Sequence, residues 1–208
     1  MFNRDKSTII HMPLKKRWLD ILAAMGWALL AGFRLVAFLA EPTPLQAGLF
    51  LFTLIVMGLF IFRRPATARG TRGAFWLAAV ASFLPALALR PAGAGFPLLG
   101  LVVQDCGLAL MILTILFLNR SFGIAPAHRG LVTRGPYRLV RHPLYAAEMV
   151  AGAGYCLGYA SVWNWSVWLV IVAAQLLRIR AEEGLLSEDA AYRAYQAQVP
   201  WRLVSGVW

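Results

Sequence analysis

The sequence is poor in charge. Only 14% of its 208 residues are charged, with 9 acidic residues against 20 Lys and Arg, whereas 60% are hydrophobic. Soluble domains carry about 25% charged and about 45–50% apolar residues. This composition excludes an ordinary water-soluble domain and predicts a chain that lies largely in lipid.

Cysteine is nearly absent as well. Cys106 and Cys156 are the only two, and both fall inside apolar stretches. Neither has a partner at the spacing of a metal site or of a redox pair. The sequence therefore offers no disulfide framework and no zinc site, and we expect no metal.

Long apolar stretches are what the sequence has instead. A bilayer-spanning helix needs about 20 mostly apolar residues, and four stretches approach that length: residues 18–40, 44–62, 73–89 and 96–118. Two shorter stretches, 144–159 and 163–177, are interpreted as a helical hairpin joined at residues 160–162. The predicted fold is all-α, a polytopic membrane helix bundle with four near-full-length spans, a C-terminal helical hairpin and a cytoplasmic C-terminal helix.

The positive charge is unevenly distributed among the loops. All but two of the 20 Lys and Arg residues, the exceptions being Arg34 and Arg90, lie before the first stretch, between the second and third, or after the fourth and the hairpin. The positive-inside rule assigns these segments to the cytoplasm. Both termini are expected there, in the inner membrane if the source is bacterial. Orientation among membrane lipids thus accounts for the net charge of +11 without a nucleic-acid partner.

Composition divides the chain into three parts. We predict a basic N-terminal segment over residues 1–17, a four-span membrane bundle over 18–118 and a cofactor-binding catalytic region over 119–208. In the last part a connector rich in Gly and Pro, residues 119–142, precedes the hairpin, and a second polar segment follows it from residue 178. Because a hairpin returns the chain to the side where it entered, the two polar segments are expected to meet.

Two clusters of polar residues flank the hairpin. His142 precedes Pro143, and proline suits the first turn of a helix because its missing N–H would be unpaired there. The N-terminus of such a helix favours an anionic ligand. At the far end, Arg178 and Glu182 are four residues apart and share a helix face, with Glu183 next to them. A solvated surface ion pair is the alternative interpretation of this second cluster.

Arginines, carboxylates and apolar walls together suit a ligand such as S-adenosylmethionine. Its carboxylate fits the guanidinium fork of an arginine, and its ribose diol fits a glutamate. Spacing alone does not select this ligand, since a nucleotide or an anionic lipid headgroup presents similar groups.

Two of the acidic residues within apolar stretches are candidates for the site. Asp105 falls within the fourth stretch, and Glu148 lies just inside the hairpin. Ionisable groups at membrane depth are functional candidates, so both are predicted to bind substrate. A structural ion pair is the alternative for Asp105.

Two sequence blocks resemble the signature of a known superfamily. The first is GLVTRGPYRLVRHPLY, residues 130–145, and the second is RIRAEE, residues 178–183, followed by Leu186, Tyr192, Tyr195 and Val199-Pro200. In this order and separation they resemble the isoprenylcysteine carboxyl methyltransferase and phospholipid methyltransferase superfamily. The resemblance covers residues from about 118 to 208.

The resemblance implies an integral membrane methyltransferase that uses S-adenosyl-L-methionine and acts on a lipophilic small molecule or a lipid-modified acceptor. Carried over by position, the cofactor-binding residues would be Tyr137, Arg141, His142, Pro143, Leu144, Tyr145, Glu182 and Glu183. The catalytic residues would be His142, Glu182 and the family's essential arginine, which corresponds to Arg178 or Arg180. The acceptor, an isoprenylcysteine-like carboxylate or a lipid headgroup, stays open, as does the oligomeric state.

Two further hypotheses remain at this point. Sterol reductases share a similar Arg-His-Pro and a closing Val-Pro-Trp-Arg-Leu-like segment, which would imply an NADPH-dependent membrane enzyme. A non-enzymatic lipid-binding membrane protein, with basic loops on anionic headgroups, is the other. The Arg-x-Glu-Glu block and the short chain favour the methyltransferase over the reductase.

Overall fold

The computed structural model describes residues 15–62, 68–69, 85–122, 127–128 and 130–208. Its helices are α1 (Lys15–Ala40), α2 (Pro44–Phe62), α4 (Pro97–Leu118), α5 (Pro143–Gly158), α6 (Val162–Leu186) and α7 (Ala190–Gln198). The short elements are the 3-10 turns η1 (Pro85–Ala88), η2 (Asn119–Ser121) and η3 (Gly135–Arg138), and the paired two-residue strands β1 (Ala68–Arg69) and β2 (Ala127–His128). The predicted all-α architecture is confirmed.

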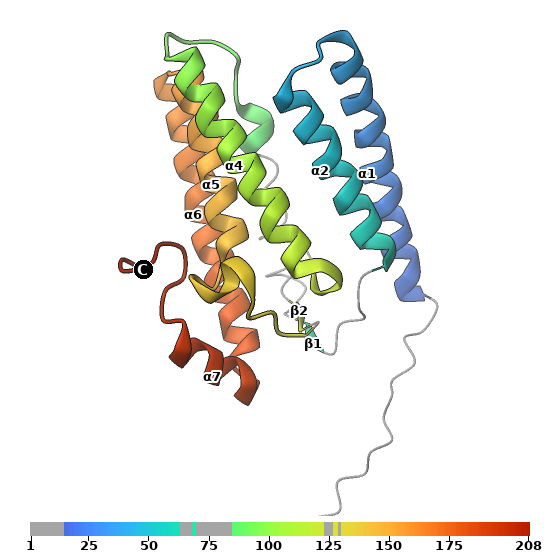
Figure 1. The fold of residues 1–208 in the computed structure, drawn as a ribbon, viewed down its shortest axis with the longest axis vertical. Coiled ribbons are helices and arrows are strands. Elements are labelled where there is room, and N and C mark those ends of the chain that lie inside the picture. The colour runs from blue at the N-terminus through green and yellow to red at the C-terminus, as the bar shows by residue number, and fades with distance from the viewer. Residues whose placement is uncertain (1–14, 63–67, 70–84, 123–126, 129) are drawn as a thin grey trace, which may run out of the picture.

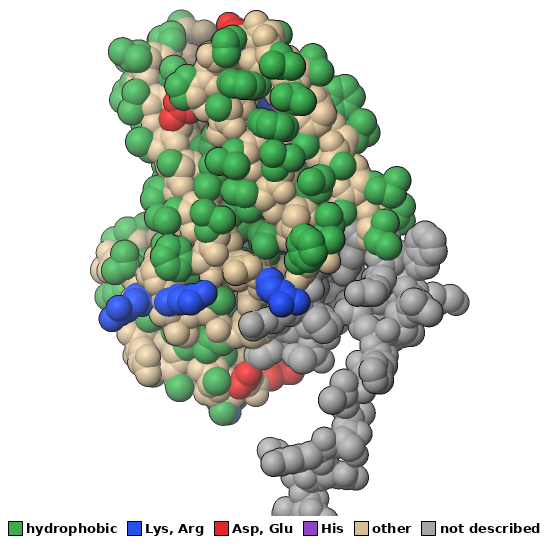
Figure 2. All heavy atoms as spheres, turned by 45° about the vertical axis from the view of Figure 1, so that its right-hand side comes forward, with side chains coloured by type: hydrophobic (Ala, Val, Ile, Leu, Met, Phe, Trp, Pro, Cys, Tyr) green, Lys and Arg blue, Asp and Glu red, His purple; other side chains and the backbone are tan. Residues whose placement is uncertain are grey.

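Within the part of the chain that the structure describes, four helical segments are long and apolar enough to cross a bilayer. They are Ile21–Ala40, Pro44–Phe62, Pro97–Ser121 and Val162–Leu186. Large apolar side chains such as Phe33, Leu39 and Leu98 are exposed on them, as expected of helices whose solvent is lipid. Figure 2 shows this hydrophobic surface, with Lys and Arg side chains in a band toward its lower edge.

The observed helices agree in part with the membrane spans predicted from the sequence. The predicted stretches 18–40, 44–62 and 96–118 correspond to α1, α2 and α4. The N-terminal segment 1–17 lies outside the described residues except for residues 15–17. Of the predicted span 73–89 the structure describes residues 85–89, which include η1. The fourth long helix is α6. It contains the predicted hairpin stretch 163–177 and continues through polar turns to Leu186.

The described helices form two groups that meet at α2 and α4 (Figure 1). α1 packs on α2, whereas α4 packs on α5 and α5 on α6. Glycines allow α4 and α5 to approach closely: a Cβ on Gly100 would collide with the backbone of Gly158, and one on Gly154 with the backbone of Gln104. Small residues at helix contacts bring backbones together in this way within membranes.

The helices of the C-terminal region begin at residues that favour a helix start. Pro143 occupies the first turn of α5. Ser161 Oγ accepts a hydrogen bond from Asn164 N at 3.1 Å ahead of α6, and Asp189 Oδ1 accepts one from Ala191 N at 2.8 Å ahead of α7. These starts fix the turns that bring α7 to the end of the bundle where η3 lies (Figure 1).

Asn164 connects the segment before α4 to the turn between α5 and α6. Its buried side chain donates to Arg90 O at 2.9 Å and Tyr159 O at 2.7 Å, and it accepts from Arg90 N at 3.0 Å. Trp163 Nε1 donates to Ala88 O at 2.7 Å, and the Arg90 guanidinium lies 4.4 Å from the centre of the Trp163 ring. The segment before α4 is thus fixed to the start of α6 mainly by neutral hydrogen bonds.

Candidate active site

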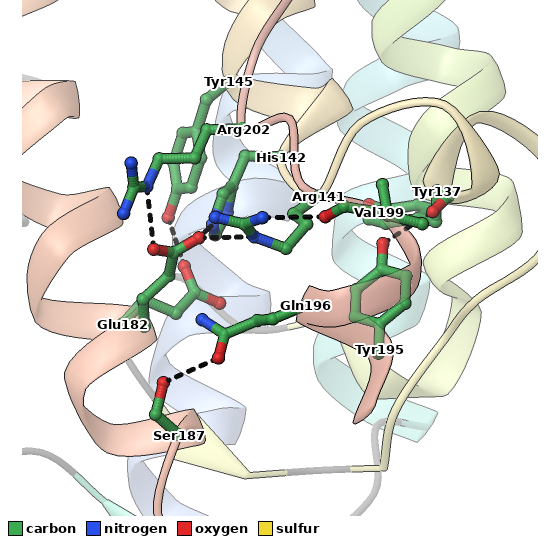
Figure 3. Close-up of polar contacts among 11 residues, drawn as sticks. Tyr137, Arg141, His142, Tyr145, Glu182, Ser187, Tyr195, Gln196, Val199 and Arg202 are labelled. Carbon is green, nitrogen blue, oxygen red and sulfur yellow. Dashed lines mark hydrogen bonds and ion pairs between the residues drawn. The ribbon is translucent and has the colours of Figure 1, made fainter. Parts of the chain in front are cut away.

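Glu183 is the centre of the polar network at the other end of the hairpin. Figure 3 labels its partners Arg141, His142 and Arg202. The buried Oε1 of Glu183 accepts a hydrogen bond from Arg141 Nε at 2.7 Å and lies 3.1 Å from His142 Nε2. Its Oε2 accepts one from Arg202 Nε at 2.8 Å. A buried carboxylate is costly unless it is paired and hydrogen-bonded. These partners meet that requirement and join the connector, α6 and the segment after α7.

Main-chain hydrogen bonds hold the same segments together. Arg141 N donates to Trp201 O at 2.9 Å, and His142 N donates to Arg202 O at 2.8 Å. The Arg141 guanidinium also donates through Nη1 to Val199 O at 2.7 Å. Both the backbone and the ring of His142 are therefore held in place by protein groups.

A pocket opens beside this network. Its apolar wall includes Leu118, Leu131, Val132, Leu144 and Leu186. Its polar and aromatic lining comes from both sequence blocks and includes Tyr137, Arg141, His142, Tyr145, Glu182, Tyr192 and Tyr195. Binding sites for small molecules combine apolar walls with a few oriented polar groups in this manner.

Glu182 has different surroundings from its neighbour Glu183. It is half-buried in the pocket wall, and its Oε2 accepts a hydrogen bond from Tyr145 Oη at 2.9 Å. The Tyr145 ring also contacts the His142 ring, with centroids 5.7 Å apart, and the Arg178 guanidinium, 4.9 Å from its centre. Of the two adjacent glutamates, one lines the pocket and the other holds chain segments together.

Arg178 extends the polar contacts along the hairpin. It is buried, and its Nη1 donates to Gln175 Oε1 at 3.0 Å, while Gln175 Nε2 donates to Glu148 Oε2. Sequence reasoning missed Gln175, which lies within an apolar stretch. Its spacing of three residues from Arg178 places both on one helix face, and that spacing is the signal that could have found it.

Two tyrosines of α7 form one side of the pocket. Tyr195 Oη donates to Tyr137 O at 2.6 Å, and burial raises the pKa of Tyr195 to about 12, so it stays a donor at neutral pH. Burial also raises the pKa of Tyr192. The buried Tyr192 hydroxyl has no hydrogen-bond partner among residues 15–62, 85–122 and 130–208, which is uncommon for such a group.

The structure brings most of the predicted site residues together. Those lining the pocket are Tyr137, Arg141, His142, Leu144, Tyr145 and Glu182, with Pro143 and Glu183 directly next to them. Arg180 is exposed on α6. Asp105 is half-buried in α4, ~20 Å along the helix from Leu118 at about 1.5 Å per residue. Glu148 and Arg178 lie outside the pocket lining; Gln175 links Glu148 to Arg178, which contacts the ring of the pocket residue Tyr145.

The region that builds the pocket also carries the family match. Residues 90–192 match the family model described as phospholipid methyltransferase. This match assigns residues 90–192 to the isoprenylcysteine carboxyl and phospholipid methyltransferase superfamily. No curated protein matches the chain. The match over residues 90–192 and the apolar helices indicate an integral membrane protein of a methyltransferase family. They favour this hypothesis over the reductase and the lipid-binding protein.

Proposed function

We propose that this protein transfers a methyl group from S-adenosyl-L-methionine to a lipophilic acceptor in the pocket beside α5 and α6. The observation that carries the proposal is the convergence of His142, Tyr145 and Glu182, from two distant sequence blocks, on one pocket. The superfamily supports the reaction class. In this proposal residues 119–208 form the catalytic region, with Leu118 adding to the pocket wall.

The pocket residues fit this cofactor. Glu182 offers a carboxylate to a ribose diol or an ammonium group, and the leucines offer an apolar wall to a purine. The buried Tyr192 hydroxyl offers a hydrogen bond that described protein groups do not take up. The cofactor's sulfonium would supply an already activated methyl group, so the residues need only position the acceptor and exclude water.

The contacts suggest distinct roles for the two glutamates and for His142. Glu182 and Tyr145 would bind and orient the cofactor. Glu183 would position His142 through the 3.1 Å contact with Nε2, in the way that a carboxylate orients a histidine base. An acceptor amine must lose a proton before it is methylated, and His142 is the proposed proton acceptor for that case. A carboxylate acceptor arrives deprotonated and needs no base.

The two candidate arginines differ in position. Arg178 is buried against Tyr145, whereas Arg180 is exposed. We therefore assign Arg178 to the role of the family's essential arginine. The acceptor would approach from the bilayer along the α5–α6 side, where Glu148 and Gln175 continue the row of polar groups. The arginine distribution supports a cytoplasmic site, and substrate binding by Asp105 stays a prediction.

Calorimetry of the protein in nanodiscs tests the proposal. We expect S-adenosylmethionine to bind and Glu182→Gln to weaken its affinity at least tenfold. Glu188→Gln is the matched control, because Glu188 is exposed in the turn after α6 and lies outside the pocket lining. An absence of binding at millimolar cofactor would contradict the proposal. Labelled methyl groups in lipid extracts from expressing cells would then identify the acceptor.

A further inference from the structure

The residues after α7 form a small closed loop, residues 202–208, called here the closing loop. The backbone N–H groups of Arg202, Leu203 and Val204 point to Trp208 O at 2.9, 2.9 and 3.2 Å. Val207 N and Trp208 N donate to Val204 O at 3.1 and 3.2 Å, and the Arg202 guanidinium lies 5.0 Å from the centre of the Trp208 ring. The loop thus satisfies much of its own backbone.

The side chains exposed by this loop are apolar. Val207 is 75% exposed and Val204 is 55% exposed. Leu139 is 67% exposed. It lies two residues before Arg141, whose backbone N–H donates to Trp201 O. Apolar surface of this kind gains free energy when it leaves water. The residues that the structure describes leave more than half of each of these side chains uncovered.

The closing loop is held at the start of α5. Arg141 and His142, whose backbones bond to Trp201 and Arg202, directly precede the first turn of that helix. Figure 1 shows the loop beside the lower part of α5 and α6, above α7 and level with the start of α5. It therefore lies at the edge of the apolar helical surface.

We propose that the closing loop inserts Val204 and Val207 into the lipid leaflet on the site's side of the membrane. Lipid is the occupant because the loop adjoins the surface that an integral membrane bundle already presents to lipid. Hydrocarbon accepts backbone only where its polar groups are satisfied, and the loop pairs five of its seven backbone N–H groups through internal hydrogen bonds. Exposed Arg138, next to Leu139, adds a cation suited to anionic headgroups.

Insertion of this loop would couple the bilayer to the site. Arg202 belongs to the loop, and its Nε also donates to Glu183 Oε2 at 2.8 Å. A leaflet that holds the Trp208 ring and the two valines therefore also holds Arg202 against Glu183. The Glu183 network is then more stable in a bilayer than in a mixture that leaves the loop in water.

Spin labels measure the depth of the loop without any methyl transfer. The full chain, with Cys106→Ala and Cys156→Ala, carries a label at Val207→Cys or, as the matched control on the exposed face of α7, at Ala197→Cys. Both proteins are placed in vesicles of phosphatidylethanolamine and phosphatidylglycerol. Power saturation then compares oxygen, which concentrates in the acyl layer, with a water-soluble nickel chelate.

We expect the label at 207 to be several-fold more accessible to oxygen than to nickel, and the label at 197 to show the reverse. Equal ratios at the two positions would overturn the proposal. Shielding of the label at 207 from both reagents, as a second copy or a protein partner would cause, would overturn it as well. Because neither cofactor nor acceptor is present, failure of the proposed methyl transfer leaves this result unchanged.

A second measurement covers the case in which the cysteine-free chain does not fold. Lipids brominated in the acyl chain quench nearby tryptophan, and we expect the native protein to lose more fluorescence than Trp208→Phe. Val207→Asp should reduce the quenching toward the level of Trp208→Phe. Identical quenching of the native protein and Trp208→Phe would contradict insertion.

Discussion

Each end of the α5–α6 hairpin is closed by a buried polar side chain, but the chemistry differs. At one end Asn164 makes neutral hydrogen bonds that all end on backbone groups. At the other end Glu183 is held by the side chains of Arg141, His142 and Arg202, and a pocket adjoins it. A neutral amide is enough to fix one segment to another. A charged network also orients side chains, which is what a reacting site requires.

The difference between the two ends of the hairpin predicts that substitution of Glu183 has the largest effect on stability and cofactor binding. Glu183→Ala leaves buried Arg141 and His142 without their carboxylate, and removal of one partner of a buried ion pair costs about 3–5 kcal/mol. We expect a loss of that size in the free energy of unfolding, together with loss of cofactor binding. Denaturant unfolding in micelles measures the first and calorimetry the second. A variant within about 1 kcal/mol of the native protein would show that Glu183 does not hold the segments together.

Asn164 should separate stability from binding. Asn164→Leu leaves the backbone groups of Arg90 without their side-chain partner, and an unsatisfied buried polar group costs about 1–3 kcal/mol. The unfolding free energy should fall by about 2 kcal/mol, while the cofactor dissociation constant of the folded protein stays the same. The contrast with Glu183 fails if the Asn164 variant also weakens cofactor binding at temperatures where it is folded.

Hydropathy predicted the helices well where lipid alone defines them. The bounds of α2 match the predicted stretch 44–62, because a uniformly apolar run ends at a pair of arginines. The predicted hairpin arm stopped at residue 177, although α6 continues to Leu186. Its last turns are polar, so hydropathy does not mark them, and they are held by contacts with Arg141 and Tyr145, which lie far away in sequence.

The site residues were predictable as a group but not in their individual positions. Adjacent residues of a helix point about 100° apart at 3.6 residues per turn, so either Glu182 or Glu183 could have faced a pocket. The choice depends on the connector and on the segment after α7. Arg202 could not be assigned for the same reason, because its place in the network depends on backbone bonds from Arg141 and His142.

A smaller effect is expected at Tyr145. Tyr145→Phe removes the 2.9 Å hydrogen bond to Glu182 but keeps the ring against Arg178. One such bond is worth about 1 kcal/mol, which corresponds to about a fivefold change in the cofactor dissociation constant. Tyr155→Phe, on the same helix but outside the pocket lining, is the matched control and should leave binding unchanged. Equal cofactor affinities for the native protein and Tyr145→Phe would show that this hydrogen bond does not contribute to cofactor binding.

The smallest effect, and the most specific to a ligand, is expected at Tyr192. Its buried hydroxyl lacks a partner among the described residues, so Tyr192→Phe removes an unsatisfied group, and the free energy of unfolding without ligand should stay level or rise by up to about 1 kcal/mol. If bound cofactor supplies the missing partner, the same change weakens binding about threefold. A purely structural tyrosine cannot produce opposite signs in the two measurements. Stability and affinity that fall together in the phenylalanine variant would therefore assign Tyr192 to packing and not to the ligand.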